Sequence, residues 1–346
     1  MENNRLRLAA LLCTLALVPP TLAQESSDQP SGEASQVAAT AYQLYQLQFG
    51  GKIFKYTKKP CSGGTCTGWQ MLDNNPSTYM IAAGGNQLYQ LHNNGLLFRY
   101  TSPACSGNSC PGWALVDNNP ATAYIAAAGN YLYQLHNTGR LWRTTCTNTG
   151  CGPWQMLDSN PATAIIAVGG NQLYQLHGNG LLWRFTGTPC NSNGCFGWEL
   201  IDTNSATFRV AAGGNRLFQL QNNGNIWQYT GPACGGNGCP GWKKLANNPG
   251  LLNIVATATQ LYQLHSNSKV WKFTGTPCSG NSCPGWQLLD VSHSSAFLAA
   301  SGNELFQIRQ DHSVWRYTGT PCQGLNCTGW QQLDKNPNTQ VLVASQ

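Results

Sequence analysis

The feature that most constrains the fold is an internal repeat of about 44 residues that fills most of the chain. Its clearest mark is the motif "LYQL" or a close variant, which recurs at intervals of 44 residues with a single interval of 41. The first leucines of the motif are Leu44, Leu88, Leu132, Leu173, Leu217, Leu261 and Leu305. Seven copies occupy residues 37–346 of the 346-residue chain, so the repeat predicts one array and no second domain.

Each repeat contains four short runs separated by turn-forming residues. In the second repeat these runs begin at Met80 ("MIAAGGN"), Leu88 ("LYQLHNN"), Leu96 ("LLFRYT") and Gly112 ("GWALVD"). None of them is long enough for a helix, and 38 Gly, 18 Pro and only 9% charged residues favour strands and turns. Four strands in a unit of this length, repeated seven times, predict an all-β, seven-bladed β-propeller.

Cysteines follow the same rhythm. Of the 15 in the chain, 14 form seven C-x4-C pairs, one in each repeat. The pairs are Cys61 and Cys66, Cys105 and Cys110, Cys146 and Cys151, Cys190 and Cys195, Cys234 and Cys239, Cys278 and Cys283, and Cys322 and Cys327. The small polar residues between them allow the loop to curl, so we predict seven local disulfides. The alternative, a zinc or iron site, needs about four convergent ligands, which pairs one repeat apart do not offer. We therefore expect no metal and no cofactor.

The N-terminal segment has the pattern of a secretory signal peptide. Arg5 and Arg7 precede an apolar run at residues 8–18, and small residues end at Ala23. We predict a signal peptide at residues 1–23, a disordered polar segment at 24–36 and the propeller at 37–346. The protein is then secreted, to the cell exterior or the periplasm. The apolar run is shorter than the roughly 20 residues of a membrane span, so no membrane insertion is expected.

The two ends of the array compete for one place in the ring. Residues 37–41 precede Leu44 at the spacing of an innermost strand, and residues 341–345 match the same strand after Pro337. Because the C-terminal run is richer in β-branched residues, the sequence favours a ring whose first blade is completed by the C-terminal strand.

The wording of the repeat resembles a known family. The recurring strands "GWxxLD", "IAAGGN", "LYQLHxxG" and "LWRYTG" are similar to the tectonin-type β-propeller repeat, and the resemblance covers all seven units. It implies a secreted or surface lectin that binds carbohydrate at repeated sites. The C-x4-C loop in every blade and the "LYQLH" wording depart from that pattern, so no ligand contact or sugar preference is carried over from the family.

The third strand of each repeat places an aromatic residue directly before a polar one. The aromatic is tryptophan in five repeats and phenylalanine in two, and the next residue is basic in all repeats but the fifth: Phe54-Lys55, Phe98-Arg99, Trp142-Arg143, Trp183-Arg184, Trp227-Gln228, Trp271-Lys272 and Trp315-Arg316. Neighbours along a strand point to opposite faces, so a seam between two blades would receive a ring from one and a donor from the other. A sugar needs both, for its CH face and its hydroxyls. We predict carbohydrate-binding residues at Trp142, Trp183, Trp227, Trp271, Trp315, Arg143, Arg184 and Arg316. The alternative is packing between blades, with arginine over an aromatic face.

Three other positions recur and are expected to be structural. The tryptophan that opens the fourth strand should cover the seam with a neighbouring blade: Trp69, Trp113, Trp154, Trp198, Trp242, Trp286 and Trp330. The aspartate that ends this strand, replaced only by Ala246, should form a turn. Second-strand glutamines and histidines should form hydrogen bonds, because Gln or Arg replaces the histidine in three repeats and breaks any symmetric metal ring.

These observations narrow the functional class. No common catalytic motif is present, so we expect no enzyme and no catalytic residues. The net charge of +6 is spread thinly, without the cluster that nucleic-acid binding needs. The favoured function is a multivalent lectin for glycans or glycoconjugates on cell surfaces. The alternative is a secreted protein-interaction or adhesion scaffold without sugar specificity.

Overall fold

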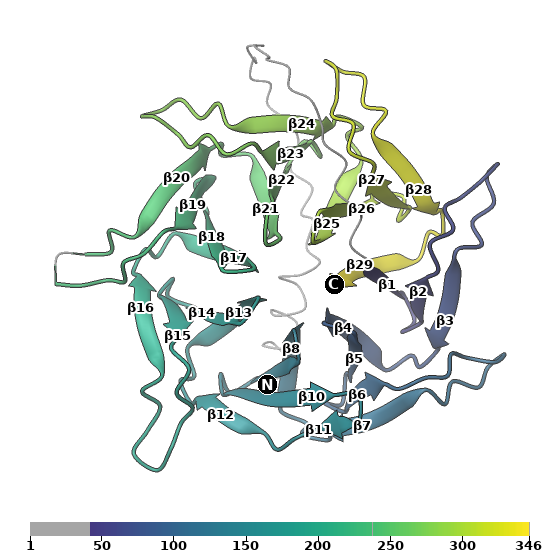
Figure 1. The fold of residues 1–346 in the computed structure, drawn as a ribbon, viewed down its shortest axis with the longest axis horizontal. Coiled ribbons are helices and arrows are strands. Elements are labelled where there is room, and N and C mark those ends of the chain that lie inside the picture. Colours follow the sequence, from purple (N-terminus) through teal and green to yellow (C-terminus); the bar gives the residue numbers. More distant parts are fainter. Residues whose placement is uncertain (1–41, 237, 346) are drawn as a thin grey trace.

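The computed structural model describes residues 42–236 and 238–345. It is an all-β ring of seven antiparallel sheets, each with four main strands, as the repeat predicts (Figure 1). The predicted signal peptide, the segment 24–36 and the candidate strand at 37–41 lie outside the described residues. Within the described part no helix is long and apolar enough to cross a membrane.

In each blade the strands lie side by side, in order from the centre of the ring to its rim. The first blade contains β29 (Thr339–Ser345), β1 (Gln43–Gln48), β2 (Ile53–Tyr56) and β3 (Trp69–Asp73). The second contains β4 (Thr78–Gly84), β5 (Gln87–His92), β6 (Leu97–Tyr100) and β7 (Trp113–Asp117). The third contains β8 (Thr122–Ala128), β9 (Tyr131–His136), β10 (Leu141–Thr147), β12 (Gln155–Asp158) and the short β11 (Gly150–Cys151).

The remaining four blades have the same order. The fourth contains β13 (Thr163–Gly169), β14 (Gln172–His177), β15 (Leu182–Phe185) and β16 (Trp198–Asp202). The fifth contains β17 (Thr207–Gly213), β18 (Arg216–Gln221), β19 (Asn225–Tyr229) and β20 (Trp242–Asn247). The sixth contains β21 (Leu251–Ala256), β22 (Leu261–His265), β23 (Val270–Phe273) and β24 (Trp286–Asp290). The seventh contains β25 (Ser295–Ser301), β26 (Glu304–Arg309), β27 (Val314–Tyr317) and β28 (Trp330–Asp334).

The C-terminal strand closes the ring. β29 pairs antiparallel with β1, and Leu44 lies opposite Ala344 (Figure 1). The hydroxyl of Thr339 also donates to Oε1 of Gln46 at 2.6 Å. The first blade therefore takes its innermost strand from the far end of the chain, as the β-branched composition of that end favours.

The core is divided among the seams between blades. Both faces of a second strand such as β14 are buried, because each blade packs between two others. The seam between the fifth and sixth blades, for example, joins Phe218 and Ile226 to Ile254 and Leu261. Apolar burial in such clusters is the main source of stability for this architecture.

The fourth-strand tryptophans bind the blades to one another. Nε1 of Trp198 donates to the carbonyl oxygen of Leu157 in the preceding blade at 2.8 Å. Five other tryptophans make the same bond to the residue 41 positions earlier, or to its equivalent across the closure of the ring: Trp69 to Leu333, Trp113 to Leu72, Trp242 to Ile201, Trp286 to Leu245 and Trp330 to Leu289. In the third blade Trp154 packs against the apolar cluster that the second and third blades share. The predicted role in covering the seams is confirmed.

All seven predicted disulfides are formed. They join Cys61 to Cys66, Cys105 to Cys110, Cys146 to Cys151, Cys190 to Cys195, Cys234 to Cys239, Cys278 to Cys283 and Cys322 to Cys327. Except in the third blade, their loops project from the rim of the ring (Figure 1). In six blades the amide of the first cysteine reaches the fourth strand of the preceding blade, as Cys190 does at the Met156 carbonyl oxygen, 2.9 Å away. Each of these loops therefore spans a seam.

The shortened third repeat lacks this contact. Its third strand continues directly into the disulfide hairpin formed by β10 and β11, and the amide of Cys146 bonds to Asn130 of its own blade. Leu115 in the second blade, the counterpart of Met156, is left 55% exposed. The three missing residues thus uncover one position of the second blade.

Some fourth-strand aspartates, among them Asp158, Asp290 and Asp334, have a second role besides the predicted turn. Oδ1 of Asp158 accepts the amide of Ser159, which is the turn contact, at 2.8 Å. Oδ2 accepts Nε2 of Gln175 in the next blade at 2.8 Å, and the Thr163 hydroxyl donates to Oε1 of the same glutamine. This Thr–Gln–Asp chain satisfies a buried amide and ties two blades together.

One seam has lost this chain. Ala246 replaces the aspartate and Leu251 replaces the threonine between the fifth and sixth blades. Oε1 of the buried Gln263 has no hydrogen-bond partner among the described residues. The two substitutions remove both hydrogen-bond partners of Gln263. This seam is therefore held mainly by apolar packing.

Candidate ligand sites at the blade seams

The third-strand tryptophans lie side by side with the second-strand polar residues of their own blades. Trp183 is paired across β14 and β15 with the buried Gln175. Its ring centroid lies 5.9 Å from that of His177, and the His136–Trp142 and His265–Trp271 pairs are 6.0 Å apart. All five tryptophans are half-buried. Part of each residue therefore remains accessible to solvent, although the Nε1 atoms of Trp142, Trp183 and Trp271 are buried without a hydrogen-bond partner in the described structure.

The residue beside the indole changes its surroundings from blade to blade. In the fifth blade Nε1 of Trp227 donates to Oε1 of Gln221 at 3.2 Å. In the seventh blade the guanidinium of Arg309 lies 4.0 Å from the ring centroid of Trp315. The seven tryptophan or phenylalanine positions are therefore not equivalent surfaces.

The second-strand histidines lie beside the third-strand rings, His136 and His177 beside an indole and His92 beside Phe98. Burial lowers the pKa of His92, His136 and His177, and the nearby aspartates offset this lowering in part. In the described part of the chain no three His, Cys, Asp or Glu residues are grouped as metal ligands would be. The histidines make ring contacts, whereas the buried Nε2 atoms of His92, His136 and His177 have no hydrogen-bond partner in the described structure, so the predicted hydrogen bonds are not seen for these atoms.

The arginines point to the opposite face of the blade and meet different rings. The guanidinium of Arg143 lies 4.7 Å from the Tyr131 ring and 5.6 Å from the Phe185 ring of the next blade. Arg184 lies 5.7 Å from Tyr229 of the fifth blade. Arg316 lies 5.4 Å from the Tyr42 ring, next to the first blade.

The tyrosine and phenylalanine rings that these arginines contact were not among the predicted site residues. Phe185 and Tyr229 stand two positions after the tryptophans of their blades, on the same face of the strand. A signal was present, because this position is Tyr or Phe in every repeat except the third, which has Thr144. Tyr131 stands out in the same way, since no other repeat has an aromatic residue directly before its motif.

The three predicted arginines differ in charge balance. Nη2 of Arg184 is 2.5 Å from Oε2 of Glu199, and Arg316 makes two bonds to Glu304 at 2.6 and 2.9 Å. These bonds raise the pKa of both guanidiniums. Arg143 instead donates to the neutral Oε1 of Gln155 at 3.1 Å. Its charge is not neutralised by a carboxylate in the described structure.

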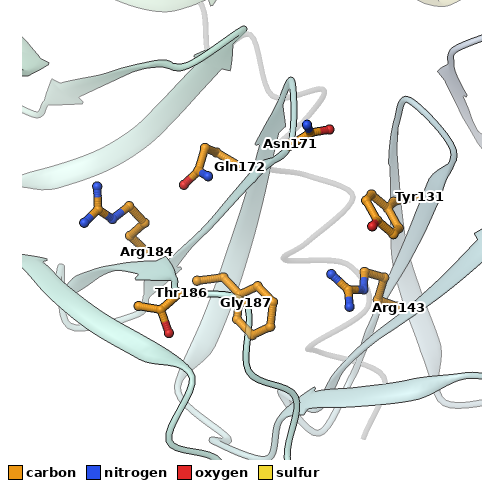
Figure 2. A pocket seen from close by; sticks show the side chains of 8 residues that line it. Tyr131, Arg143, Asn171, Gln172, Arg184, Thr186 and Gly187 are labelled. Carbon is orange, nitrogen blue, oxygen red and sulfur yellow. The ribbon is translucent and has the colours of Figure 1, made fainter.

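Arg143 and Arg184 both line a pocket of about 500 Å³ between the third and fourth blades. Figure 2 shows Arg143 and Tyr131 on one side and Arg184 and Gln172 on the other. Asn171, Phe185, Thr186 and Gly187 complete the lining. No Asp or Glu lines this pocket, and none of the five predicted tryptophans does.

A second, shallower hollow of about 190 Å³ lies where the innermost strands of the blades meet. Small residues such as Gly84, Gly169 and Gly213 line it. A Cβ atom on Gly213 would lie 2.4 Å from the backbone of Thr257, so glycine is needed for the close approach of neighbouring blades. The hollow contains no charged side chain, and packing accounts for its composition.

Comparison with known proteins shows the architecture. No family model matches the chain, and no curated protein matches it in sequence. Solved structures that are similar in fold include the following three. Prp20p from Saccharomyces cerevisiae has 11% identity and a TM-score of 0.55, over 86% of this chain and 87% of its own. Human WBSCR16 has 8% identity and a TM-score of 0.52, over 80% and 88%. YCF48 bound to D1 peptide has 14% identity and a TM-score of 0.52, over 80% and 87%. At these identities the likeness concerns the fold alone, a seven-bladed β-propeller similar to propellers of the RCC1 type.

Proposed function

We propose that this protein is a secreted, multivalent carbohydrate-binding protein of the tectonin-like type, without enzymatic activity, whose sites lie at the seams between blades. The observation that carries the proposal is the repeated placement of a half-buried third-strand aromatic ring beside a second-strand histidine or glutamine. A ring face accepts the CH surface of a sugar, and amide, imidazole and guanidinium groups bind its hydroxyls.

Repetition also supports this function. A shallow site gives a small sugar few contacts to offset the freedom that it loses, so single sites are expected to be weak. Several sites on one rigid ring that faces a glycan-coated surface gain roughly 10² to 10⁴ in avidity without any new contact. Seven local disulfides fit an oxidising compartment and thus the proposed secretion.

A glycan array probed with the chain from residue 24 onward tests the proposal. Binding to a defined group of glycans, competed by the free sugar, is the expected result. Agglutination of cells that carry those glycans then measures multivalency. If the folded protein binds no glycan on the array and agglutinates no glycan-coated cell, the proposed function is wrong.

A protein-binding scaffold is the second candidate. Leu115, Phe196 and Leu325 are 55%, 75% and 82% exposed on the described structure, and apolar side chains at the rim suit a protein surface. Prp20p is described with binding properties to Gsp1p and histones, and YCF48 with a bound D1 peptide. Loss of binding to an isolated partner in Leu115→Ser, with sugar binding absent, would favour this candidate.

A further inference from the structure

We infer that the pocket between the third and fourth blades binds an acidic sugar, through the carboxylate or sulfate group that the sugar carries. The inference rests on the proposed function and adds to it the chemical class of ligand for one seam. It is carried by the unbalanced charge of Arg143 in a pocket that also offers aromatic and amide groups.

The pocket has an unbalanced positive charge. The lining contains two guanidiniums and no carboxylate. Glu199 neutralises Arg184, whereas the polar contacts of Arg143 are with the neutral Gln155 and with Tyr133. Burial raises the pKa of Tyr133 to about 12, so its phenol does not supply a negative charge near neutral pH. The pocket therefore attracts anions.

The position of the Arg143 guanidinium suits an anionic group. Arg143 is held between the rings of Tyr131 and Phe185, with its guanidinium 4.7 and 5.6 Å from their centroids. Contact with two rings restricts the position of the guanidinium, and its five N–H donors exceed the bonds that it makes to Gln155 and Tyr133. A planar fork held in this way is suited to two parallel bonds to a carboxylate or sulfate group.

The aromatic and amide groups of the pocket suit the rest of a sugar. Tyr131 and Phe185 present rings, and Asn171 and Gln172 present amides that both donate and accept hydrogen bonds (Figure 2). The volume of about 500 Å³ lies within the usual range of small-molecule sites. An anion without a sugar ring would use only part of this lining, so a sugar acid fits it better than a simple ion.

Other seams replace the same features. At the position of Arg143 the fifth blade has Gln228, and the fourth and seventh blades have arginines paired with glutamates. In the second blade Arg99 is buried and donates to the Thr147 carbonyl oxygen. The first and sixth blades have Lys55 and Lys272 at this position, and lysine lacks the planar fork of arginine. The acidic preference is therefore expected from the seam of the third and fourth blades.

Calorimetric titration with matched sugars tests the inference. The probes are the methyl glycosides of glucose and glucuronic acid, those of galactose and galacturonic acid, and a 6-sulfated glucoside. We expect an acidic member to bind at least about tenfold more tightly than its neutral partner, since hydrogen bonds to charged groups contribute more than neutral ones. The sulfated arm shows which anionic group is preferred.

Two variants locate the preference. Arg143→Gln should abolish it, and it introduces the residue that Gln228 provides naturally in the fifth blade. Lys55→Gln removes the same charge at the equivalent position of the first blade and should leave the preference unchanged. The wild-type preference should also weaken as salt rises from about 50 to 500 mM, which tests the charge without any substitution.

Each of the other outcomes contradicts the inference, the proposed function or both. Sugar binding without an acidic preference, or a preference that Arg143→Gln retains or Lys55→Gln also removes, overturns the inference and leaves the proposed function standing. Failure of the wild type to bind any sugar overturns the proposed function as well. Acetate or sulfate binding as tightly as the acidic sugar shows an anion site and overturns sugar recognition in this pocket.

Discussion

Nε2 of Gln46 donates a 2.9 Å hydrogen bond to Oδ2 of Asp334, 288 residues later in the sequence. The bond joins the first blade to the seventh by the contact that Gln175 and Asp158 make between the fourth and third. Both partners are buried, so each would leave the other unsatisfied if it were removed. The same bond is thus used at the closure of the ring and within it.

We expect this bond chain to be restorable where it is missing. The double variant Ala246→Asp with Leu251→Thr places an acceptor and a donor beside Gln263. Leu251→Thr alone should destabilise the protein, because it removes a buried apolar side chain. Together the two changes should show a favourable coupling of about 1 kcal/mol or more in urea unfolding, and strictly additive effects would contradict the prediction.

The buried histidines predict loss of stability on acidification. In the unfolded chain a histidine titrates near about pH 6.5, whereas burial lowers the pKa of His92, His136 and His177 in the fold. The unfolded state then binds more protons, so the free energy of unfolding falls as pH drops from about 6.5 toward the folded-state pKa.

Replacing these three histidines by glutamine, which Gln48 and Gln221 provide naturally at this position, should reduce that fall. Urea unfolding at about pH 7.5 and about pH 5.5 measures it. An unchanged slope in the triple variant would show that other groups control the acid response.

The third-strand tryptophans should act together in surface binding. Trp183→Ala should weaken agglutination only modestly, because the remaining sites still engage the surface. Replacing Trp142, Trp183, Trp227, Trp271 and Trp315 together by alanine should abolish it, with a parallel Trp→Phe series as the control for folding. If the quintuple variant is folded and agglutinates like the parent, these residues serve packing only.

The C-terminal strand should matter far more than the segment at 24–36. Deleting residues 338–346 removes β29 together with its pairing to β1 and the buried Leu342, and should cost at least about 3 kcal/mol. Deleting residues 24–36, which the sequence predicts to be disordered, should cost almost nothing. Melting temperatures of the two deletions compare them directly, and equal small losses would contradict the assigned closure.

The disulfides should be individually dispensable but unequal. Cys234→Ser with Cys239→Ser should cost about 2 kcal/mol, since the loop closed by the bridge is short. Cys146→Ser with Cys151→Ser should cost more, because Cys146 is fully buried in the seam cluster of the second and third blades. Global unfolding at room temperature of the variant without Cys234 and Cys239 would show that a single bridge is essential.

The fold was predictable because every blade repeats the same local rules. Strand alternation, turn residues and one cysteine pair recur with a nearly fixed period. A strand that is hard to predict in one repeat can therefore be located from the other six. The 41-residue interval even marked the blade whose loop is short. Its effect on Leu115 was not predictable, because that residue belongs to the preceding repeat and meets the loop only in three dimensions.

The site was harder to predict because it lies between blades. Alternation along a strand gives the face on which Arg143 lies, but the stagger of neighbouring blades decides that it meets Phe185. The charge balance was equally hidden, since Glu199 lies on the strand next to Arg184 and not beside it in the sequence. Sequence patterns thus supplied the types of residue, and packing selected the pairs.

The pairing of Gln43 with Ser345 sets an order of events during synthesis. Six blades can form as the ribosome delivers their four consecutive strands, but the first must wait for the final residues of the chain. Until then the edge of β1 is unpaired, and such an edge can pair with another chain. Closing a loop of this length is slow, so the pairing of β29 with β1, more than any local step, is expected to time the completion of the ring.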